Sequence, residues 1–557
     1  MRRIATMLGV FVILVPVSRA SVAGEMDGDG IDVIPRPVLA ERLEGVFHVT
    51  PSTRILAQGA AAAEAKKLVE ALAPAMGFSL ELTASLRPGE RAIEMRLDES
   101  LSSLGAEGYE LGVTPERIAI VAAQPAGLFY GIQTLRQLLP AAVFGRTNAE
   151  EVVWDVPCVN VTDHPRFAWR GLLVDPARHF IAKGDLLRFI DVMALHKFNR
   201  LQIHLTDNEG WRIEIRKYPK LTEIGSKMDW NLRHRDGTGP RCFGFYTQDD
   251  MRQIVRYAAE RHITVVPEIE MPFHTGGAIV AYPELGIAPG RLVPLPIEQR
   301  WRKTSGLIAP RPETVAFFQE VLTEIMELFP SKHIHIGGDE ANIDLWTNDP
   351  EMQAQMKRLQ LKDAHELHSW FIKQMDVFLS RHGRRLVGWD EILQGGLAPG
   401  ATVMSWRGEQ GGIAAANAGH DVVMAPTSHT YFDYYQGPAE SEPLAIGGDL
   451  PLARVYSYDP IPAAIEADKV HHVLGVQGQL WGEFIATPEH LNYMAYPRAA
   501  ALAEVGWSAR EAKDYAPFVG RLRRHLERLR TLGVHFRSLD GRRNGYGSAV
   551  CGTSSIS

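Results

Sequence analysis

The sequence is poor in cysteine and carries no excess of positive charge. It has three cysteines, Cys158, Cys242 and Cys551, which are far apart in the chain. One disulfide could form, but a disulfide framework is excluded, and the cysteines have no metal-ligand spacing. The formal net charge of -7 argues against a general nucleic-acid binder, which usually has a basic face.

Long hydrophobic runs are also scarce. The only marked one, residues 4–17, follows a basic start and precedes small residues at 20–23. It is shorter than the roughly 20 apolar residues that cross a bilayer. This order is typical of a secretory signal peptide, which we expect at residues 1–23. Its removal would leave a periplasmic or extracellular protein, and an uncleaved membrane anchor is the alternative.

The first unit after the signal, residues 32–164, has the pattern of an α+β domain. Apolar residues alternate in short stretches that predict strands, and alanine-rich stretches predict helices. The strands are expected near 93–97, 109–113 and 118–122, and the helices at 60–75 and 125–139.

From residue 165 to about 510 short apolar stretches alternate with amphipathic ones. The expected strands are 171–175, 200–206, 263–269, 333–337, 385–389, 401–406, 421–425 and 473–480. The expected helices include 184–197, 248–261, 313–328, 363–381 and 411–418. Strands followed in turn by helices predict a parallel (β/α)8 TIM barrel, with an open doubly wound sheet as the alternative. Residues 511–557 are expected to form a C-terminal helix and a flexible tail.

Polar and aromatic residues follow nearly every expected barrel strand. In a TIM barrel the catalytic groups lie on the loops after the carboxyl ends of the strands. One such residue could be a cap or a surface ion pair, but repetition at strand after strand indicates a site. The residues concerned are Asp207, His274, Asp339, Glu340, Trp389, Trp406, Tyr431, Asp433, Trp481 and Glu483.

The adjacent acids Asp339 and Glu340 are the first chemical signal. They follow an apolar strand and two glycines, which allow the chain to turn and a ligand to approach the backbone. Two carboxyl groups with separated pKa values are what glycoside hydrolysis usually requires. An isolated acidic pair is more often a solvated surface feature, so the pair needs support from its surroundings.

Indoles and charged groups give that support. Trp389, Trp406 and Trp481 each follow an expected strand, and indole rings pack well against the apolar faces of sugars. Charged side chains can hold sugar hydroxyls through charge-assisted hydrogen bonds, and we expect this of Arg170, Asp433 and Glu483. A salt bridge at the domain junction is the alternative for Arg170.

Histidines raise the question of a metal. A zinc site can be imagined from His204, His274, His333 and His335, but the chain has no His-Glu-x-x-His helix and no tight ligand cluster. We therefore expect no metal and no other cofactor. His274 is expected to orient an acid through a hydrogen bond.

Several ordered motifs together resemble glycoside hydrolase family 20, the β-N-acetylhexosaminidases. They are residues 130–135 (YGIQTL), 166–171 (RFAWRG), 175–180 (DPARHF), 204–212 (HLTDNEGWR), 335–340 (HIGGDE), 388–391 (GWDE), 431–436 (YFDYYQ) and 479–483 (QLWGE). The resemblance implies a non-catalytic α+β domain before a (β/α)8 barrel. It also implies a retaining exo-enzyme that removes terminal N-acetylglucosamine or N-acetylgalactosamine from a glycan through an oxazolinium intermediate.

The resemblance also implies roles for single residues. Glu340 would be the general acid/base, Asp339 and Tyr431 would hold the acetamide, and Asp207 and His274 would orient Glu340. The sugar would be held by Arg170, Asp433 and Glu483 and walled by Trp389, Trp406 and Trp481. The chain departs from the family pattern at Asn208, Glu209, Glu270 and Phe273, where Asp, Gln, Asp and Gly are common.

Two other functions stay open on the sequence. One is a barrel glycosidase with a protein nucleophile, in which Glu391 or Glu270 acts together with Glu340. The other is a barrel that binds amino sugars without cleaving them.

Overall fold

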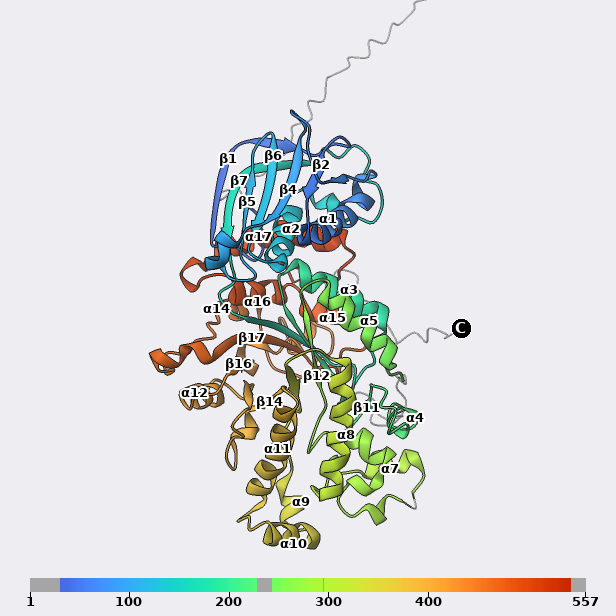
Figure 1. The fold of residues 1–557 in the computed structure, drawn as a ribbon. Helices are drawn as coiled ribbons and strands as arrows, with labels where there is room; N and C mark the ends of the chain where they lie inside the picture. Colours follow the sequence, from blue (N-terminus) through green and yellow to red (C-terminus); the bar gives the residue numbers. More distant parts are fainter. Residues whose placement is uncertain (1–30, 228–242, 294, 542–557) are drawn as a thin grey trace, which may run out of the picture.

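A sheet domain and a barrel domain lie one on the other in the computed structural model, which describes residues 31–227, 243–293 and 295–541 (Figure 1). The expected signal peptide, Cys242, Cys551 and most of the expected tail lie outside the described residues. Cys158 is buried and has no disulfide partner within that part of the chain. None of the helices described there is long and apolar enough to cross a membrane.

Seven strands form one mixed sheet in the first domain. Tyr109, Leu111 and Val113 are buried in their strand while Glu110 is exposed, so the expected alternation is confirmed. In spatial order the strands are β1 (Leu39–His48), β7 (Asp155–Asp163), β5 (Tyr109–Val113), β6 (Arg117–Ala122), β4 (Ala92–Leu97), β2 (Arg54–Ala57) and β3 (Glu81–Thr83). Helices α1 (Ala60–Met76) and α2 (Pro125–Leu138) cover the face of the sheet nearer the barrel (Figure 1).

Eight parallel strands close into a barrel, which confirms the TIM-barrel prediction and excludes the open sheet. Strand β17 pairs with β8 from Gly475–Trp169 to Leu480–Val174, and this pairing closes the ring. The strands are β8 (Trp169–Val174), β9 (Arg200–His204), β12 (Thr264–Glu268), β13 (His333–His335), β14 (Arg385–Trp389), β15 (Thr402–Ser405), β16 (Val422–Met424) and β17 (Val473–Leu480).

Helices cover the outside of the barrel at the expected places. They are α3 (Lys183–Leu195), α5 (Gln248–Ala259), α8 (Pro312–Leu328), α11 (Ala364–Arg381) and α12 (Gln410–Asn417), and α16 (Arg498–Trp507) is a further helix. The connection after β13 is longer than a simple loop and carries α9 (Ile343–Thr347) and α10 (Pro350–Arg358), which extend from the end of the barrel (Figure 1).

The barrel interior combines an apolar cluster with a chain of buried amides and acids. Trp169, at the start of β8, donates its indole N–H to Gln477 over 3.0 Å. Gln477 donates to Gln202 over 2.7 Å, and Gln202 donates to Glu268 over 2.8 Å. Because buried polar groups need hydrogen-bond partners, this series of hydrogen bonds fixes the rotamers of the side chains that lie along the barrel interior toward its carboxyl end.

The C-terminal helix joins the two domains. Helix α17 (Tyr515–Thr531) begins after an Asp514 N-cap and lies beside the sheet domain (Figure 1). Arg528 on this helix donates to the main-chain oxygen of Gln137 over 2.7 Å. His525 meets His196 of the barrel, with 2.8 Å between their Nε2 atoms. The helix therefore contributes to the stability of the domain junction.

Candidate active site

A pocket of about 260 Å³ lies at the carboxyl end of the barrel strands. Pockets for drug-sized ligands run from roughly 300 to 1,000 Å³, so this one suits a single sugar ring. It is lined by Arg178, His274, Asp339, Glu340, Trp389, Trp406, Tyr431, Asp433, Tyr434, Ile446, Gly447, Gly448, Trp481 and Glu483. Nine of the residues expected from the sequence are therefore brought together here, and Asp207 lies directly behind His274.

The acid pair stands on a sharp turn after β13. Gly337 and Gly338 have φ values of 70° and 97°, and Glu340 also has a positive φ of 51°. A Cβ atom on Gly337 would lie 1.7 Å from Glu270 Oε2, so both conformation and space require glycine there. The turn gives the two acids different environments, because the Asp339 side chain is 12% exposed and that of Glu340 is 55% exposed.

His274 connects Glu340 to Asp207. Its Nδ1 lies 3.2 Å from Asp207 Oδ1, and its Nε2 lies 3.2 Å from Glu340 Oε2 and 3.6 Å from Asp339 Oδ2. Burial by itself lowers the pKa of His274, but the charge of Asp207, the hydrogen bonds to Asp207 and Glu340 and the charge of Asp339 together outweigh it and raise the pKa well above its ordinary value. The hydrogen bond from His274 lowers the pKa of Glu340. In the free protein the shared proton therefore resides on His274.

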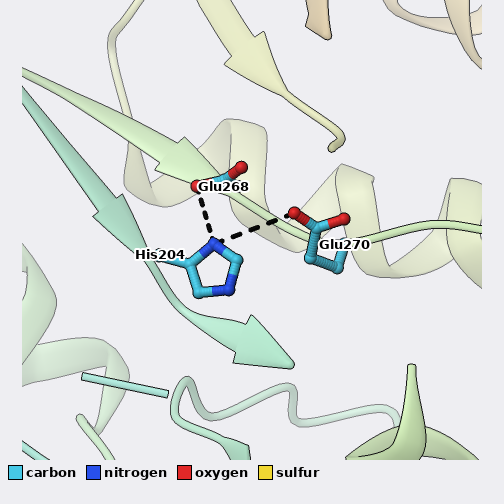
Figure 2. A group of neighbouring side chains, drawn as sticks. All are labelled: His204, Glu268 and Glu270. Carbon is cyan, nitrogen blue, oxygen red and sulfur yellow. Dashed lines mark ion pairs between the residues drawn. The ribbon is translucent and has the colours of Figure 1, made fainter. Parts of the chain in front are cut away.

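A second histidine, His204, continues these contacts from Asp207 to Glu268 and Glu270, and Figure 2 shows it with the two glutamates. His204 Nε2 lies 3.0 Å from Asp207 Oδ2, and its Nδ1 lies 2.8 Å from Glu268 Oε2 and 3.8 Å from Glu270 Oε1. Burial alone lowers the pKa of His204, but the charge of Glu268 and the neighbouring acids raise it to about 10. His204 is therefore a buried cation that keeps Asp207 ionised.

Two groups of side chains have the composition of a metal site. One is His204, Glu268 and Glu270, and the other is His274 with the acid pair. Glu268 already accepts hydrogen bonds from Gln202 over 2.8 Å and from Trp389 over 3.0 Å, and it pairs with His204. These contacts give Glu268 a structural role. His333, one of the histidines of the imagined zinc site, lies at the other end of its strand against the ring of Trp169.

Aromatic rings form one wall of the pocket. The rings of Trp389 and Trp481 lie 5.6 Å apart, and those of Trp406 and Tyr431 are stacked at 6.1 Å. Trp406 donates its indole N–H to Glu391 over 2.9 Å, which fixes the ring. Burial, followed by the charge of Asp433, raises the pKa of Tyr431, so its hydroxyl stays protonated. This wall provides apolar surface for a sugar and one hydroxyl donor.

Two carboxylate oxygens of the residues that line the pocket lack hydrogen-bond partners within the described chain. Asp433 Oδ1 and Glu483 Oε2 are buried and have no hydrogen-bond partner among the described residues. Burial and the charge of Glu483 raise the pKa of Asp433 well above its ordinary value, and burial also raises the pKa of Glu483. A ligand that donates hydroxyls would satisfy these oxygens, whose desolvation otherwise costs free energy.

Comparison with known proteins decides between the families that this geometry allows. The model of the glycosyl hydrolase family 20 catalytic domain matches residues 167–510, and that of family 20 domain 2 matches residues 30–164. The chain belongs to glycosyl hydrolase family 20. The resemblance seen in the motifs is thereby confirmed, and the chain is a glycoside hydrolase of the β-N-acetylhexosaminidase type.

Named relatives and solved structures agree with the family. The chain is 44% identical over 513 residues to a β-hexosaminidase of Porphyromonas gingivalis, covering 91% of this chain and 64% of that protein. It is 34% identical to one of Akkermansia muciniphila, covering 78% of this chain and 86% of that protein. The family 20 β-N-acetylhexosaminidase of Streptomyces coelicolor aligns with a TM-score of 0.79 and 32% identity, covering 92% of this chain and 98% of that one.

A further solved structure shows a product in a family 20 site. It is a mutant Streptomyces plicatus β-hexosaminidase in complex with product, GlcNAc. It aligns with a TM-score of 0.79 and 31% identity, and the alignment covers 92% of this chain and 97% of that one.

Arg178 is a pocket residue that lies in the 175–180 motif but received no role from the sequence. Its side chain is 10% exposed, it lines the pocket, and its guanidinium lies 3.0 Å from Asp175, 2.7 Å from Asp207 and 3.9 Å from Glu483. It follows the end of β8 by four residues, which is where the barrel rule places catalytic groups. The sequence places Arg178 after the end of that strand, but the role in binding ring hydroxyls was assigned to Arg170 instead.

The expectation that Arg170 binds ring hydroxyls is wrong, because Arg170 lies at the opposite end of β8. It is 1% exposed and meets the sheet domain through a 2.8 Å ion pair with Glu107. It also donates to the main-chain oxygens of Lys197 over 2.9 Å and Phe167 over 2.7 Å. As the second residue of its strand, it belongs to the end of the barrel that serves stability.

Arg170→Leu is expected to lower the free energy of unfolding by about 3–5 kcal/mol, because it leaves Glu107 and main-chain oxygens unpaired at a buried junction. Urea unfolding followed by circular dichroism measures this loss, with the exposed Arg523→Leu as the control. We expect kcat and KM of the folded enzyme to stay unchanged. A raised KM with an unchanged free energy of unfolding would contradict this and would support a role of Arg170 in sugar binding.

The departures from the family pattern surround His274 without displacing it. Asn208 approaches His274 Nδ1 at 3.3 Å through its amide nitrogen and accepts from the main-chain nitrogen of Gly276 over 3.1 Å. The ring of Phe273 lies against His274, with ring centroids 4.4 Å apart. His274 still reaches both Asp207 and Glu340, so the path between these acids is kept.

Proposed function

We propose that this enzyme removes single terminal β-linked N-acetylhexosamine residues from the non-reducing ends of glycans, with retention of configuration and with the substrate's acetamide as nucleophile. One observation carries the proposal. The pocket joins the half-exposed Glu340, the buried Asp339, an aromatic wall and two buried carboxylate oxygens without hydrogen-bond partners in the described chain, all within a volume for one sugar. The N-acetylglucosamine product in the Streptomyces plicatus enzyme supports this sugar as the occupant.

In this proposal Asp339 and Tyr431 hold the acetamide. Asp339 accepts the acetamide N–H, and the Tyr431 hydroxyl donates to the carbonyl oxygen, which then lies under the anomeric carbon. As that oxygen attacks, positive charge develops on the acetamide and is stabilised by the Asp339 carboxylate. An intramolecular group held in line lowers the barrier by about 7–11 kcal/mol at most. Family 20 is a known exception to the scheme with two protein carboxylates.

Glu340 and His274 move the proton. Glu340 stands at the pocket mouth, where the leaving oxygen would lie, and His274 holds the proton in the free enzyme. Binding of a sugar removes water from Glu340 and raises its pKa, because burial disfavours the carboxylate. The proton then passes along the 3.2 Å contact from His274 to Glu340 and on to the leaving group. Glu340 afterwards takes a proton from water.

Neither candidate for a protein nucleophile lies in the pocket wall. Glu391 is buried and accepts the indole N–H of Trp406 over 2.9 Å. Glu270 is 1% exposed and lies behind Gly337. Among the described residues that line the pocket, the acids are Asp339, Glu340, Asp433 and Glu483. The intact pair of Asp339 and Glu340 beside Tyr431 also favours an enzyme over a barrel that only binds sugar.

A β-glucoside without the acetamide is expected to be turned over barely or not at all. The comparison uses p-nitrophenyl β-N-acetylglucosaminide and p-nitrophenyl β-glucoside, which share one leaving group and differ only at C2. Because the attacking oxygen belongs to the acetamide, kcat/KM should fall by several orders of magnitude, within the range that intramolecularity provides. Similar kcat/KM values for both glycosides would contradict the proposal.

We also propose that the enzyme is exported to the periplasm or beyond the cell. The support is the order of basic, apolar and small residues at positions 1–23. Cell fractionation and N-terminal sequencing of the purified protein test it, and the expected start lies after Ala20 or Ala23. A cytoplasmic protein that keeps Met1 would contradict export.

A further inference from the structure

Four carboxylates surround the guanidinium of Arg178. Asp175, Asp207, Glu209 and Glu483 each lie within 4.0 Å of one of its nitrogens. Asp207 has two further cationic neighbours, His204 and His274. Glu209 and Glu483 have no such second cation among the described contacts, so the group holds more acid than base. At least one of these acids has to carry a proton for the cluster to be stable.

Glu209 has the geometry of the acid that carries it. It stands in the turn between β10 (Thr206–Asp207) and β11 (Gly210–Trp211) and is 6% exposed. Its Oε2 accepts from Arg178 Nε over 3.3 Å. Asp207 and Glu209 contact neighbouring nitrogens of this one guanidinium, Nη2 over 2.7 Å and Nε over 3.3 Å, so the two carboxyl groups lie close together and repel each other unless a proton is held between them.

Asp207 cannot supply that proton. Burial alone would raise its pKa, but the charges of Arg178 and His274 and the hydrogen bond from His204 lower it well below the ordinary value. For Glu209 the balance is reversed, because burial and then the charge of Asp207 raise its pKa to about 8. Arg178 opposes this shift, and Glu483 adds to it. The proton in the contact therefore belongs to Glu209.

We propose that Glu209 is a positioning residue, which donates its carboxyl proton to Asp207 and accepts from Arg178 Nε, so that the guanidinium stays directed at the sugar hydroxyls. The inference rests on the proposed function and adds that Arg178 binds those hydroxyls together with Asp433 and Glu483, which line the same pocket. When Glu209 loses its proton, its charge repels Asp207 and attracts the guanidinium away from the pocket. Sugar binding then weakens.

Sugar binding is expected to weaken as the pH rises, because the raised pKa of Glu209 places its ionisation in the alkaline range. Glu209 is neutral below about pH 8 and ionised above it. If the protonated form binds sugar and the ionised form does not, KM rises in proportion to the loss of the protonated fraction. Between pH 7 and pH 9 this amounts to about tenfold for a group that titrates near pH 8.

Glu209→Gln tests the proposal, because the amide accepts from Arg178 and donates to Asp207 at every pH. We expect it to keep the wild-type KM at pH 7 and to lose the rise in KM between pH 7 and pH 9. Glu209→Met removes both contacts within a similar volume, and its KM should be raised at pH 7 and flat up to pH 9. Steady-state kinetics on p-nitrophenyl β-N-acetylglucosaminide give KM and kcat separately across this range.

Three results would overturn the proposal. They are a wild-type KM that stays constant up to pH 9, a Gln variant that keeps the wild-type rise, and a Gln variant with a strongly raised KM at pH 7. Calorimetric titration with N-acetylglucosamine at pH 7 and pH 9 repeats the test without turnover. A wild-type enzyme that leaves the glucosaminide uncleaved would instead contradict the proposed function.

Discussion

Glu340→Gln is expected to lower kcat on a substrate with a poor leaving group, such as chitobiose, by about 10²–10⁴-fold. The leaving oxygen of a sugar needs a proton in the transition state, and Gln cannot transfer one. On an activated aryl glycoside the loss should be smaller, because that leaving group departs with little protonation. The ratio of the two losses, measured by steady-state kinetics, identifies the acid.

Binding should survive this substitution, since Gln has nearly the same shape and the sugar-binding role is proposed for other pocket residues, Arg178, Asp433 and Glu483. Calorimetric titration with N-acetylglucosamine checks this. Glu313→Gln, in the exposed first turn of α8, is the matched control and should leave kcat unchanged. A Glu340→Gln enzyme with near-full activity on chitobiose would exclude Glu340 as the acid.

Asp339→Asn is expected to lower kcat on p-nitrophenyl β-N-acetylglucosaminide by about 10²–10³-fold, the loss typical of one interaction made with developing charge. Burial and the charges of Glu268 and Glu340 raise the pKa of Asp339, and His274 opposes them. Positive charge on the acetamide would lower this pKa again, so the carboxylate is most stable in the transition state. An amide offers no such charge, and KM should change little.

A substrate without the acetamide provides the control for Asp339. Residual hydrolysis of the β-glucoside should be the same in the wild type and in Asp339→Asn, because the group that Asp339 holds is missing. The two substrates and two enzymes form a cycle that isolates the coupling between Asp339 and the acetamide. Equal losses on both substrates would assign Asp339 a general role in pocket structure.

The barrel could be predicted from sequence because its strands are short, apolar and separated by helices. All eight expected strands are present, with bounds that differ by a few residues. The clearest difference is at β13, which ends at His335 because Gly337 and Gly338 turn out of the extended conformation. The alternation of apolar residues along the strand does not predict such a turn. The turn requires glycine at 337 because Glu270 occupies the space beside it.

The site could be predicted less completely, for a reason that the two arginines illustrate. Arg170 and Arg178 lie eight positions apart around one strand, and both occur in motifs of the family. Which of them faces the sugar depends on which end of β8 each occupies, and Arg170 faces Glu107 of the other domain. The sequence allowed a salt bridge at the domain junction as the alternative for Arg170, but it could not name the partner, which lies 63 positions away in the chain.

The proton on Glu209 is a further property that sequence could not supply. A glutamate in a turn is usually predicted to be a charged surface residue. The neutral state proposed for Glu209 depends instead on its burial beside Asp207. The same holds for His204, whose charge depends on its contacts with Asp207 and with Glu268, and Figure 2 shows the contact with Glu268.

Intact-protein mass spectrometry during turnover tests the central claim most directly. Rapid acid quenching of the wild type with p-nitrophenyl β-N-acetylglucosaminide, under conditions where release of the aryl group is fast, would preserve any ester between a sugar and a side chain. We expect an unchanged protein mass, since the acetamide oxygen of the substrate forms the new bond to the anomeric carbon of the same sugar. A protein mass increased by one N-acetylhexosaminyl group, located to any carboxylate, would contradict it.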